Sequence, residues 1–161
     1  TDNYNPRTGL VSLSQGTYGS TSVAALAVAA HEIGHVMQHQ EGYIPIKIRN
    51  AILPAASIGS TAAPYIVILG AIMGSYNLAM IGVYLFLAML IFQIVTLPVE
   101  LNASSRGLEM LESGGYISYD QRGDAKAVLK AAAMTYIVAA LSTLVSFLRL
   151  LMIAGNSRRR N

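Results

Sequence analysis

Two histidines and a glutamate in one short stretch have the types and the spacing of a metal-dependent hydrolytic site. Residues 31–35 read His-Glu-Ile-Gly-His. On an α-helix, positions four apart differ by about 40° in direction and lie about 6 Å apart along the axis. His31 and His35 can therefore share one metal ion at about 2.0–2.1 Å from each ring nitrogen. Glu32 is turned by about 100° from His31, so it flanks the metal and can take a proton from water that a zinc ion acidifies.

The residues around this HExxH pattern predict the helix that the pattern requires. The segment before the pattern is rich in alanine and contains Leu26, which favours a helix. Thr21 or Ser22 can cap its start, and Gly42 follows its end. HExxH on a helix is typical of zinc metallopeptidases. The competing interpretation is a helix that carries two exposed histidines by chance. All three histidines of the chain fall within residues 31–39, which favours a metal site.

The composition predicts a membrane protein. Hydrophobic residues make up 53% of the 161 residues and charged residues only 12%, against about 25% in soluble domains. Residues 50–99 contain no Asp, Glu, Lys or Arg, whereas one membrane span needs only about 20 apolar residues. We expect three transmembrane helices in one membrane-embedded domain covering residues 1–161, with spans over about residues 52–73, 78–97 and 131–153.

Prolines and glycines refine the prediction for the spans. Pro54 and Pro64 lie at the start and inside the first span, where a kink is expected. Pro98 is predicted to end the second span, and residues 101–112 are predicted to form a separate short amphipathic helix that stops at Gly114.

The N-terminal region predicts one short strand over residues 10–14. Val11 and Leu13 share one face and Ser12 lies on the other. Two interpretations stand equally: a strand that covers the core, or an edge strand that pairs with an extended substrate backbone. The predicted fold class is therefore mainly α, an integral membrane helical protein with an HExxH helix and a short N-terminal strand.

A catalytic zinc ion needs a third protein ligand. His39 continues the row of histidines, but it lies about 12 Å from His31 along the axis, which is too far for one ion to bind all three. We expect it to be a neighbouring polar residue or a substrate contact. Glu41 stands where HExxHxxGxxH proteins have a third histidine.

Glu100 is the preferred third ligand, for a topological reason. Two predicted spans separate it from His35, and two crossings return the chain to the membrane face that it left. The competing interpretation is that Glu100 marks a helix boundary. The remaining candidates have helical spacing or capping positions and are typical of a solvated surface: Glu109, Glu112, Asp120 and Asp124.

Other function classes find no support in the composition. The chain has no cysteine, which excludes disulfides and thiolate metal sites. The net charge of +3 is modest, and basic residues do not alternate with aromatic ones, so nucleic-acid binding is not predicted.

Three blocks of sequence resemble a known family. They are DNYNPRTGLVSLS, AVAAHEIGHVMQHQEGY and LPVELNASSRGLEMLESGG. Together they are similar to the bacterial YugP-like neutral zinc metallopeptidases, the zinc-dependent membrane metallopeptidase family 2, over nearly the whole chain. The order of HExxH, two spans and a glutamate-bearing helix also resembles the Ste24/HtpX type of membrane peptidase.

The resemblance implies a set of roles. His31, His35 and Glu100 would bind zinc, and Glu32 would be the general base. Asn102 and Ser104 stand where Ste24-type enzymes have acidic residues, so the partners of the zinc histidines are left open, with hydrogen bonds from these two as one solution. The resemblance also implies one more membrane helix upstream of Thr1.

These observations predict a zinc-dependent endopeptidase of the bacterial cell membrane that acts on membrane or membrane-proximal proteins. The donor to the oxyanion stays open among four residues: His39, Arg106, Tyr116 and Tyr119. The alternative is a non-catalytic zinc-binding scaffold, and a transporter is a weaker third option because no span carries a buried charge. The excess of Lys and Arg on the site-bearing side predicts that the site faces the cytoplasm, although the C-terminal arginines oppose this.

Overall fold

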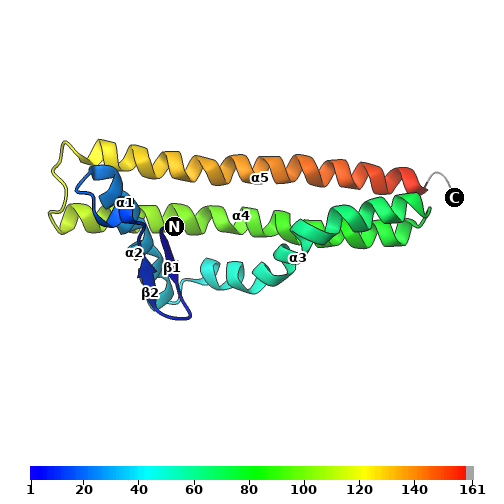
Figure 1. The fold of residues 1–161 in the computed structure, drawn as a ribbon, viewed down its shortest axis with the longest axis horizontal. Coiled ribbons are helices and arrows are strands. Elements are labelled where there is room, and N and C mark those ends of the chain that lie inside the picture. Colours follow the sequence, from blue (N-terminus) through cyan, green and yellow to red (C-terminus); the bar gives the residue numbers. More distant parts are fainter. Residues whose placement is uncertain (159–161) are drawn as a thin grey trace. The chain divides into compact units, whose positions relative to one another are not determined.

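The protein is mainly helical, as predicted (Figure 1). The structure is a computed structural model that describes residues 1–158. The elements follow the order β1 (Asn3–Asn5), β2 (Leu10–Ser12), α1 (Gln15–Tyr18), α2 (Val23–Gln40), α3 (Ile44–Ile72), α4 (Tyr76–Ser113) and α5 (Arg122–Arg158).

The described chain forms two compact units. The first contains residues 1–46 and 97–135, and the second contains residues 47–96 together with the chain from Tyr136 onward. Helices α3, α4 and α5 each contribute residues to both units. Every residue of the HExxH pattern, and also Glu100, lies in the first unit, so the candidate site is described within that unit.

Three helices are long and apolar enough to cross a membrane: α3, α4 and α5. All three helices predicted to span the membrane are therefore present as candidate spans, and each is longer than the apolar stretch from which it was predicted. In α3, Pro54 and Pro64 lie inside one continuous helix, and the helix bends between its cyan and green parts (Figure 1). Proline removes one backbone hydrogen bond and crowds the preceding turn, which bends a helix without ending it when packing supports both sides.

The prediction that Pro98 ends the second apolar helix is wrong. Pro98 lies inside α4, which continues to Ser113 and absorbs the separate helix expected over residues 101–112. A single proline costs about 3 kcal/mol in a helix interior, and packing on the residues that follow offsets this cost. Glu100 therefore lies well inside a helix, and the competing interpretation that it marks a helix boundary is also wrong.

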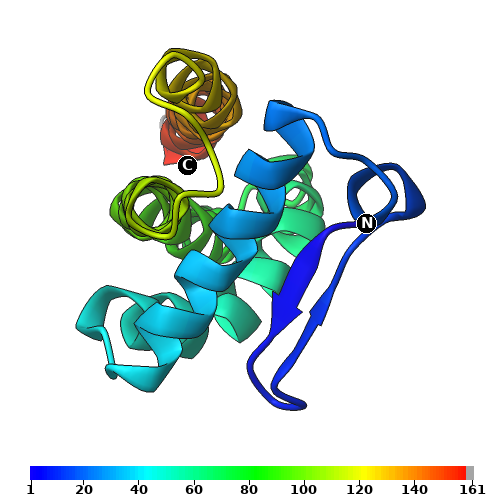
Figure 2. The same cartoon turned by 90° about the vertical axis from the view of Figure 1, so that its left-hand side faces the viewer.

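The predicted N-terminal strand is present as β2, and it pairs with a strand that was not predicted from the sequence. The antiparallel strand β1 places Tyr4 opposite Val11. Strand β1 contacts α2. Figure 2 shows α2 between this hairpin and the C-terminal part of α4. The hairpin therefore covers a face of the helix that carries the HExxH pattern.

Small residues allow α2 and α4 to approach closely. A Cβ atom on Gly34 would collide with the carbonyl oxygen of Ala103 and lie 2.8 Å from its carbonyl carbon. A Cβ atom on Gly107 would lie 2.6 Å from the carbonyl oxygen of Ala30. Ala30 and Gly34, and likewise Ala103 and Gly107, are four residues apart and form facing stripes. The approach that these stripes permit brings α4 to the turn of α2 that carries the histidines.

An apolar cluster extends this contact within the first unit. Its buried members come from α2, from α4, from the loop after α4 and from the start of α5: Ala27, Ala30, Leu111, Ile117, Ala125 and Leu129.

Helix α2 begins as predicted, because the Ser22 side chain accepts a hydrogen bond of 3.2 Å from the backbone N–H of Ala25.

Replacing Gly34 with alanine is expected to destabilise the first unit and weaken metal binding. The added methyl group meets backbone, which cannot rotate away, and overpacking of this kind costs about 1–3 kcal/mol. Because α4 must move, the carboxylate of Glu100 moves with it. Thermal unfolding followed by circular dichroism, together with zinc titration against a chelator, measures both effects.

Gly123→Ala is the matched control, because a Cβ atom on Gly123 meets no atom within 4 Å. It should unfold and bind zinc like the wild type. A Gly34→Ala protein indistinguishable from that control would contradict the role given to the close approach.

The second unit has its own core, built on the same principle of small residues between helices. A Cβ atom on Gly70 would lie 2.8 Å from the Cα atom of Ala79, and one on Gly82 would lie 2.7 Å from a methyl group of Val67. The buried cluster is Ala63, Val67, Ala79, Val83, Phe86, Leu150 and Ala154. Helices in a membrane gain stability from close packing of this kind, because lipid is as apolar as the side chains.

Candidate metal centre

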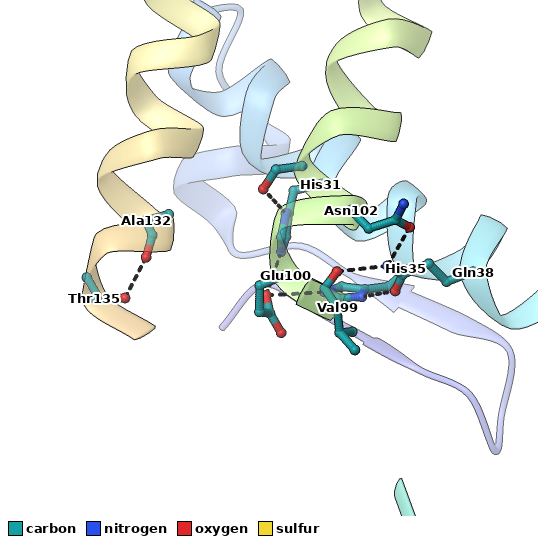
Figure 3. Close-up of polar contacts among 9 residues, drawn as sticks. His31, His35, Gln38, Val99, Glu100, Asn102, Ala132 and Thr135 are labelled. Atoms are coloured by element: carbon teal, nitrogen blue, oxygen red, sulfur yellow. Dashed lines mark hydrogen bonds and ion pairs between the residues drawn. The ribbon is translucent and has the colours of Figure 1, made fainter. Parts of the chain in front are cut away.

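Three side chains from two helices converge on one point. The Nε2 atom of His31 lies 3.2 Å from Oε2 of Glu100, and the Nε2 atom of His35 lies 3.5 Å from the same oxygen. The two imidazole rings are nearly perpendicular, with centroids 4.7 Å apart. Figure 3 shows both histidines reaching from α2 towards Glu100 on α4. The pairing that the topological argument predicted is therefore present.

The spacing of these atoms fits a zinc ion. With bonds of about 2.0–2.1 Å and tetrahedral angles, two ligand atoms of one zinc ion lie about 3.3–3.4 Å apart, close to the two separations from Glu100. Ligand atoms of all three side chains lie within 4.8 Å of one another. Two imidazole nitrogens and a carboxylate are also a ligand set that catalytic zinc uses. The three residues present are suited to hold the ion.

Glu32 is buried beside these side chains. Burial raises the pKa of its carboxyl group, the nearby His31 and His35 lower it, the negative charge of Glu100 raises it, and a hydrogen bond from the backbone N–H of Tyr4 lowers it; the net effect is a raised pKa. A carboxylate whose protonated form is stabilised in this way is suited to accept a proton and later release it.

The pKa of His35 is also raised. Burial lowers it, but the hydrogen bond to Glu100 and the negative charge of that residue more than offset the cost of burial. Positive charge is thus favourable where the imidazole meets the carboxylate. A bound divalent cation would supply that positive charge.

The second nitrogen of each imidazole also has a partner. Nδ1 of His31 lies 3.0 Å from Oγ of Ser104, and Nδ1 of His35 lies 3.0 Å from Oε1 of Gln38. Partners of this kind orient metal-binding histidines. Ser104 was among the predicted partners, whereas Gln38 was missed. The sequence could have indicated Gln38 as a partner, because position 38 is three residues after His35 and so lies on the same helix face.

The remaining predicted site residues lie around this centre. Asn102 Oδ1 accepts hydrogen bonds from Nε2 of Gln38 at 2.9 Å and from Nε of Arg106 at 2.8 Å. Nη1 of Arg106 pairs with Oε2 of Glu41 at 2.6 Å. Arg106 is thus tied into the structure rather than free to meet a substrate.

His39 lies outside the cluster, as the helix geometry required. It is exposed, and its Nδ1 atom lies 3.0 Å from the hydroxyl oxygen of Tyr4 in β1. Among the residues that the structure describes, the group that could hold a metal ion consists of His31, His35 and Glu100 and does not include His39. Tyr116 and Tyr119 are exposed on the loop between α4 and α5.

Comparisons with known proteins identify the family of the chain. No solved structure matches the chain. The protein named "Putative membrane protease YugP" from Bacillus subtilis (strain 168) is 43% identical over 161 residues, which is 100% of this chain and 72% of that protein. Residues 1–155 match the family described as "Putative neutral zinc metallopeptidase". The chain therefore belongs to this family of zinc metallopeptidases, as the resemblance of its three sequence blocks implied.

Proposed function

We propose that this protein is a zinc-dependent membrane endopeptidase that hydrolyses peptide bonds in membrane or membrane-proximal proteins. The observation that carries the proposal is the meeting of His31, His35 and Glu100 beside the buried carboxylate of Glu32. A carboxylate next to a three-ligand site is the arrangement that hydrolysis with an activated water requires.

In this proposal His31, His35 and Glu100 hold the zinc ion. When bound, the ion supplies a Lewis acid that polarises a carbonyl group and acidifies water. Glu32 takes one proton from the attacking water, whose oxygen forms a bond to the peptide carbonyl carbon. Glu32 then returns that proton to the leaving nitrogen as the carbon–nitrogen bond breaks. The products are a carboxylic acid and an amine, and Glu32 ends in its starting state.

The tetrahedral oxyanion needs a hydrogen-bond donor. Arg106 is engaged by Asn102 and Glu41, whereas the exposed imidazole of His39 has one described hydrogen-bond partner, the hydroxyl group of Tyr4. We therefore favour His39 over Arg106 for this role.

The placement in the cell is part of the same proposal. Three helices can cross a bilayer, and the Bacillus subtilis relative is named a membrane protease. We propose that residues 1–161 form one membrane-embedded peptidase domain of a bacterial cell membrane, with its site facing the cytoplasm. The orientation is supported by the Lys and Arg residues on the site-bearing side.

Removal of the metal tests the proposed function. The purified protein in detergent or nanodiscs is incubated with casein and with a membrane-protein substrate, and new peptide termini are identified by mass spectrometry. Chelation of zinc is expected to abolish cleavage, and stoichiometric zinc should restore it. A His35→Ala protein purified in parallel reports contaminating peptidases and should release no new termini.

A protein that binds stoichiometric zinc yet cleaves none of these substrates would contradict the peptidase proposal. That outcome would support the alternative of a zinc-binding membrane scaffold. Cleavage that persists after complete removal of zinc would also contradict it.

A further inference from the structure

A chain of hydrogen bonds connects a surface ion pair to one of the histidines. From Glu41 it runs to Arg106, from Arg106 to Asn102, and from Asn102 to Gln38. It ends at Nδ1 of His35, which lies 3.0 Å from Oε1 of Gln38. Figure 3 shows the last part of the chain, with Gln38 between Asn102 and His35.

Two groups of fixed polarity determine the direction of every bond in this chain. Arginine only donates, so Asn102 must present its Oδ1 atom to Nε of Arg106 at 2.8 Å. The same oxygen then accepts from Gln38. Independently, the backbone carbonyl of Val99 only accepts, and it lies 2.8 Å from Nε2 of Gln38. Both constraints turn the amide nitrogen of Gln38 towards α4.

The other end of the Gln38 amide is therefore an oxygen, and an amide oxygen cannot donate. Nδ1 of His35 must be the donor in the bond to Oε1 of Gln38. The neutral imidazole then carries its hydrogen on Nδ1 and its lone pair on Nε2. That lone pair points to the place where Oε2 of Glu100 lies 3.5 Å away, so two electron-rich atoms face a position suited to a cation.

We infer that Gln38 is a positioning residue that fixes the tautomer and the ring orientation of His35 for metal binding. The inference rests on the proposed metal site, but not on peptide hydrolysis. His31 differs in this respect, because its partner Ser104 has a hydroxyl group that can either donate or accept. Among the contacts that the structure describes, the amide oxygen of Gln38 requires a hydrogen on Nδ1 of His35, whereas Ser104 imposes no such requirement on Nδ1 of His31.

Burial strengthens the effect of Gln38 on the imidazole of His35. Gln38 is fully buried, and its two amide hydrogens and its oxygen are all used, by Val99, Asn102 and His35. Turning the amide over would place oxygen against the carbonyl of Val99 and against Oδ1 of Asn102. The fold therefore places a hydrogen on Nδ1 of His35 before a metal arrives.

Two replacements of Gln38 separate positioning from a merely structural role. Gln38→Glu keeps an acceptor for Nδ1 of His35 but loses both donors to α4. Gln38→Met keeps the length of the side chain but loses the acceptor as well. Gln40→Ala is the matched control, since Gln40 is an exposed residue of the same type two positions later on α2.

The primary measurement is zinc affinity by competition with a chelator. Loss of a partner of a metal-bound histidine lowers affinity by about 10–100-fold, and this loss is expected for Gln38→Met. Gln38→Glu should stay within about tenfold of the wild type, because a carboxylate is a good partner for a metal-binding imidazole. Gln40→Ala should bind like the wild type. Circular dichroism establishes that each variant is folded.

A second measurement reads the tautomer directly in the metal-free protein. Nitrogen–proton correlation spectra of the imidazoles distinguish hydrogen on Nδ1 from hydrogen on Nε2, and the chain has only three histidines. In the wild type and in Gln38→Glu, Nδ1 of His35 should carry a hydrogen whether or not Nε2 is protonated. In Gln38→Met the Nε2–H form should gain population.

Equal losses of zinc affinity in Gln38→Glu and Gln38→Met would overturn the inference, because they would indicate a purely structural tie between α2 and α4. Wild-type affinity in folded Gln38→Met would also overturn it. These readouts involve no substrate, so absence of peptide cleavage would contradict the proposed function and leave this inference standing.

Discussion

Replacing Glu32 with glutamine is expected to reduce peptide hydrolysis by about 10²–10⁴-fold, the range that a positioned general base contributes. Glutamine has nearly the shape of glutamate but cannot accept a proton from the attacking water. Zinc affinity should change little, because His31, His35 and Glu100 remain in place. Steady-state cleavage of a fluorogenic peptide, together with zinc stoichiometry, measures both quantities in one preparation.

Glu109→Gln is the matched control, because Glu109 is an exposed carboxylate of the same type within the first unit. It should retain the activity of the wild type. If Glu32→Gln retained a tenth or more of the wild-type rate, another group would have to act as the base, and the assignment of Glu32 would be wrong.

Replacing Glu100 with alanine is expected to lower zinc affinity by more than about 100-fold. Loss of an outer partner of a ligand already costs about 10–100-fold, and Glu100 lies within 3.5 Å of both histidine Nε2 atoms. Peptide cleavage should be lost together with zinc. Chelator competition gives the affinity, and circular dichroism establishes that α2 and α4 are still formed.

Glu109→Ala, nine positions later on the same helix, removes an exposed carboxylate and should bind zinc normally. A Glu100→Ala protein that kept wild-type affinity would show that the third ligand lies elsewhere. The site would then have to be rebuilt around the two histidines alone.

The approach of α4 to α2 could be predicted only in part. That Glu100 returns to the side of the HExxH helix followed from counting two apolar spans. The distance could not follow, because it depends on Gly34 facing Ala103 and Gly107 facing Ala30. Glycine and alanine are common in apolar helices, so their pairing across two helices is visible only once the helices are packed.

The continuation of α4 through Pro98 also could not be predicted from the sequence. Proline is a strong local signal for the end of a helix, but local signals compete with packing energies of several kcal/mol. After Pro98 the helix buries the side chains of Val99, Ala103 and Leu111, and that burial offsets the lost hydrogen bond. The sequence shows the proline but not the surface that receives these side chains.

Within the site, the role of Gln38 could not be predicted from the sequence alone. Its spacing from His35 is local, and a helix wheel places the two on one face. Its role depends on Val99 and Asn102, which are more than sixty positions away. The carbonyl of Val99, and Arg106 through its bond to Asn102, decide which end of the amide faces the imidazole.

The sequence by itself determined the parts of this protein that lie within one helical turn or one composition window. His31, Glu32 and His35 are placed by the 3.6-residue period of a single helix, and the three membrane-capable helices follow from their apolar length. The tertiary structure decided what meets across helices: Glu100 at the histidines, Gln38 locked between Val99 and Asn102, and β1 beside α2. Local geometry fixes the first kind of neighbour, whereas the second kind depends on how side chains far apart in the chain fill the space between helices.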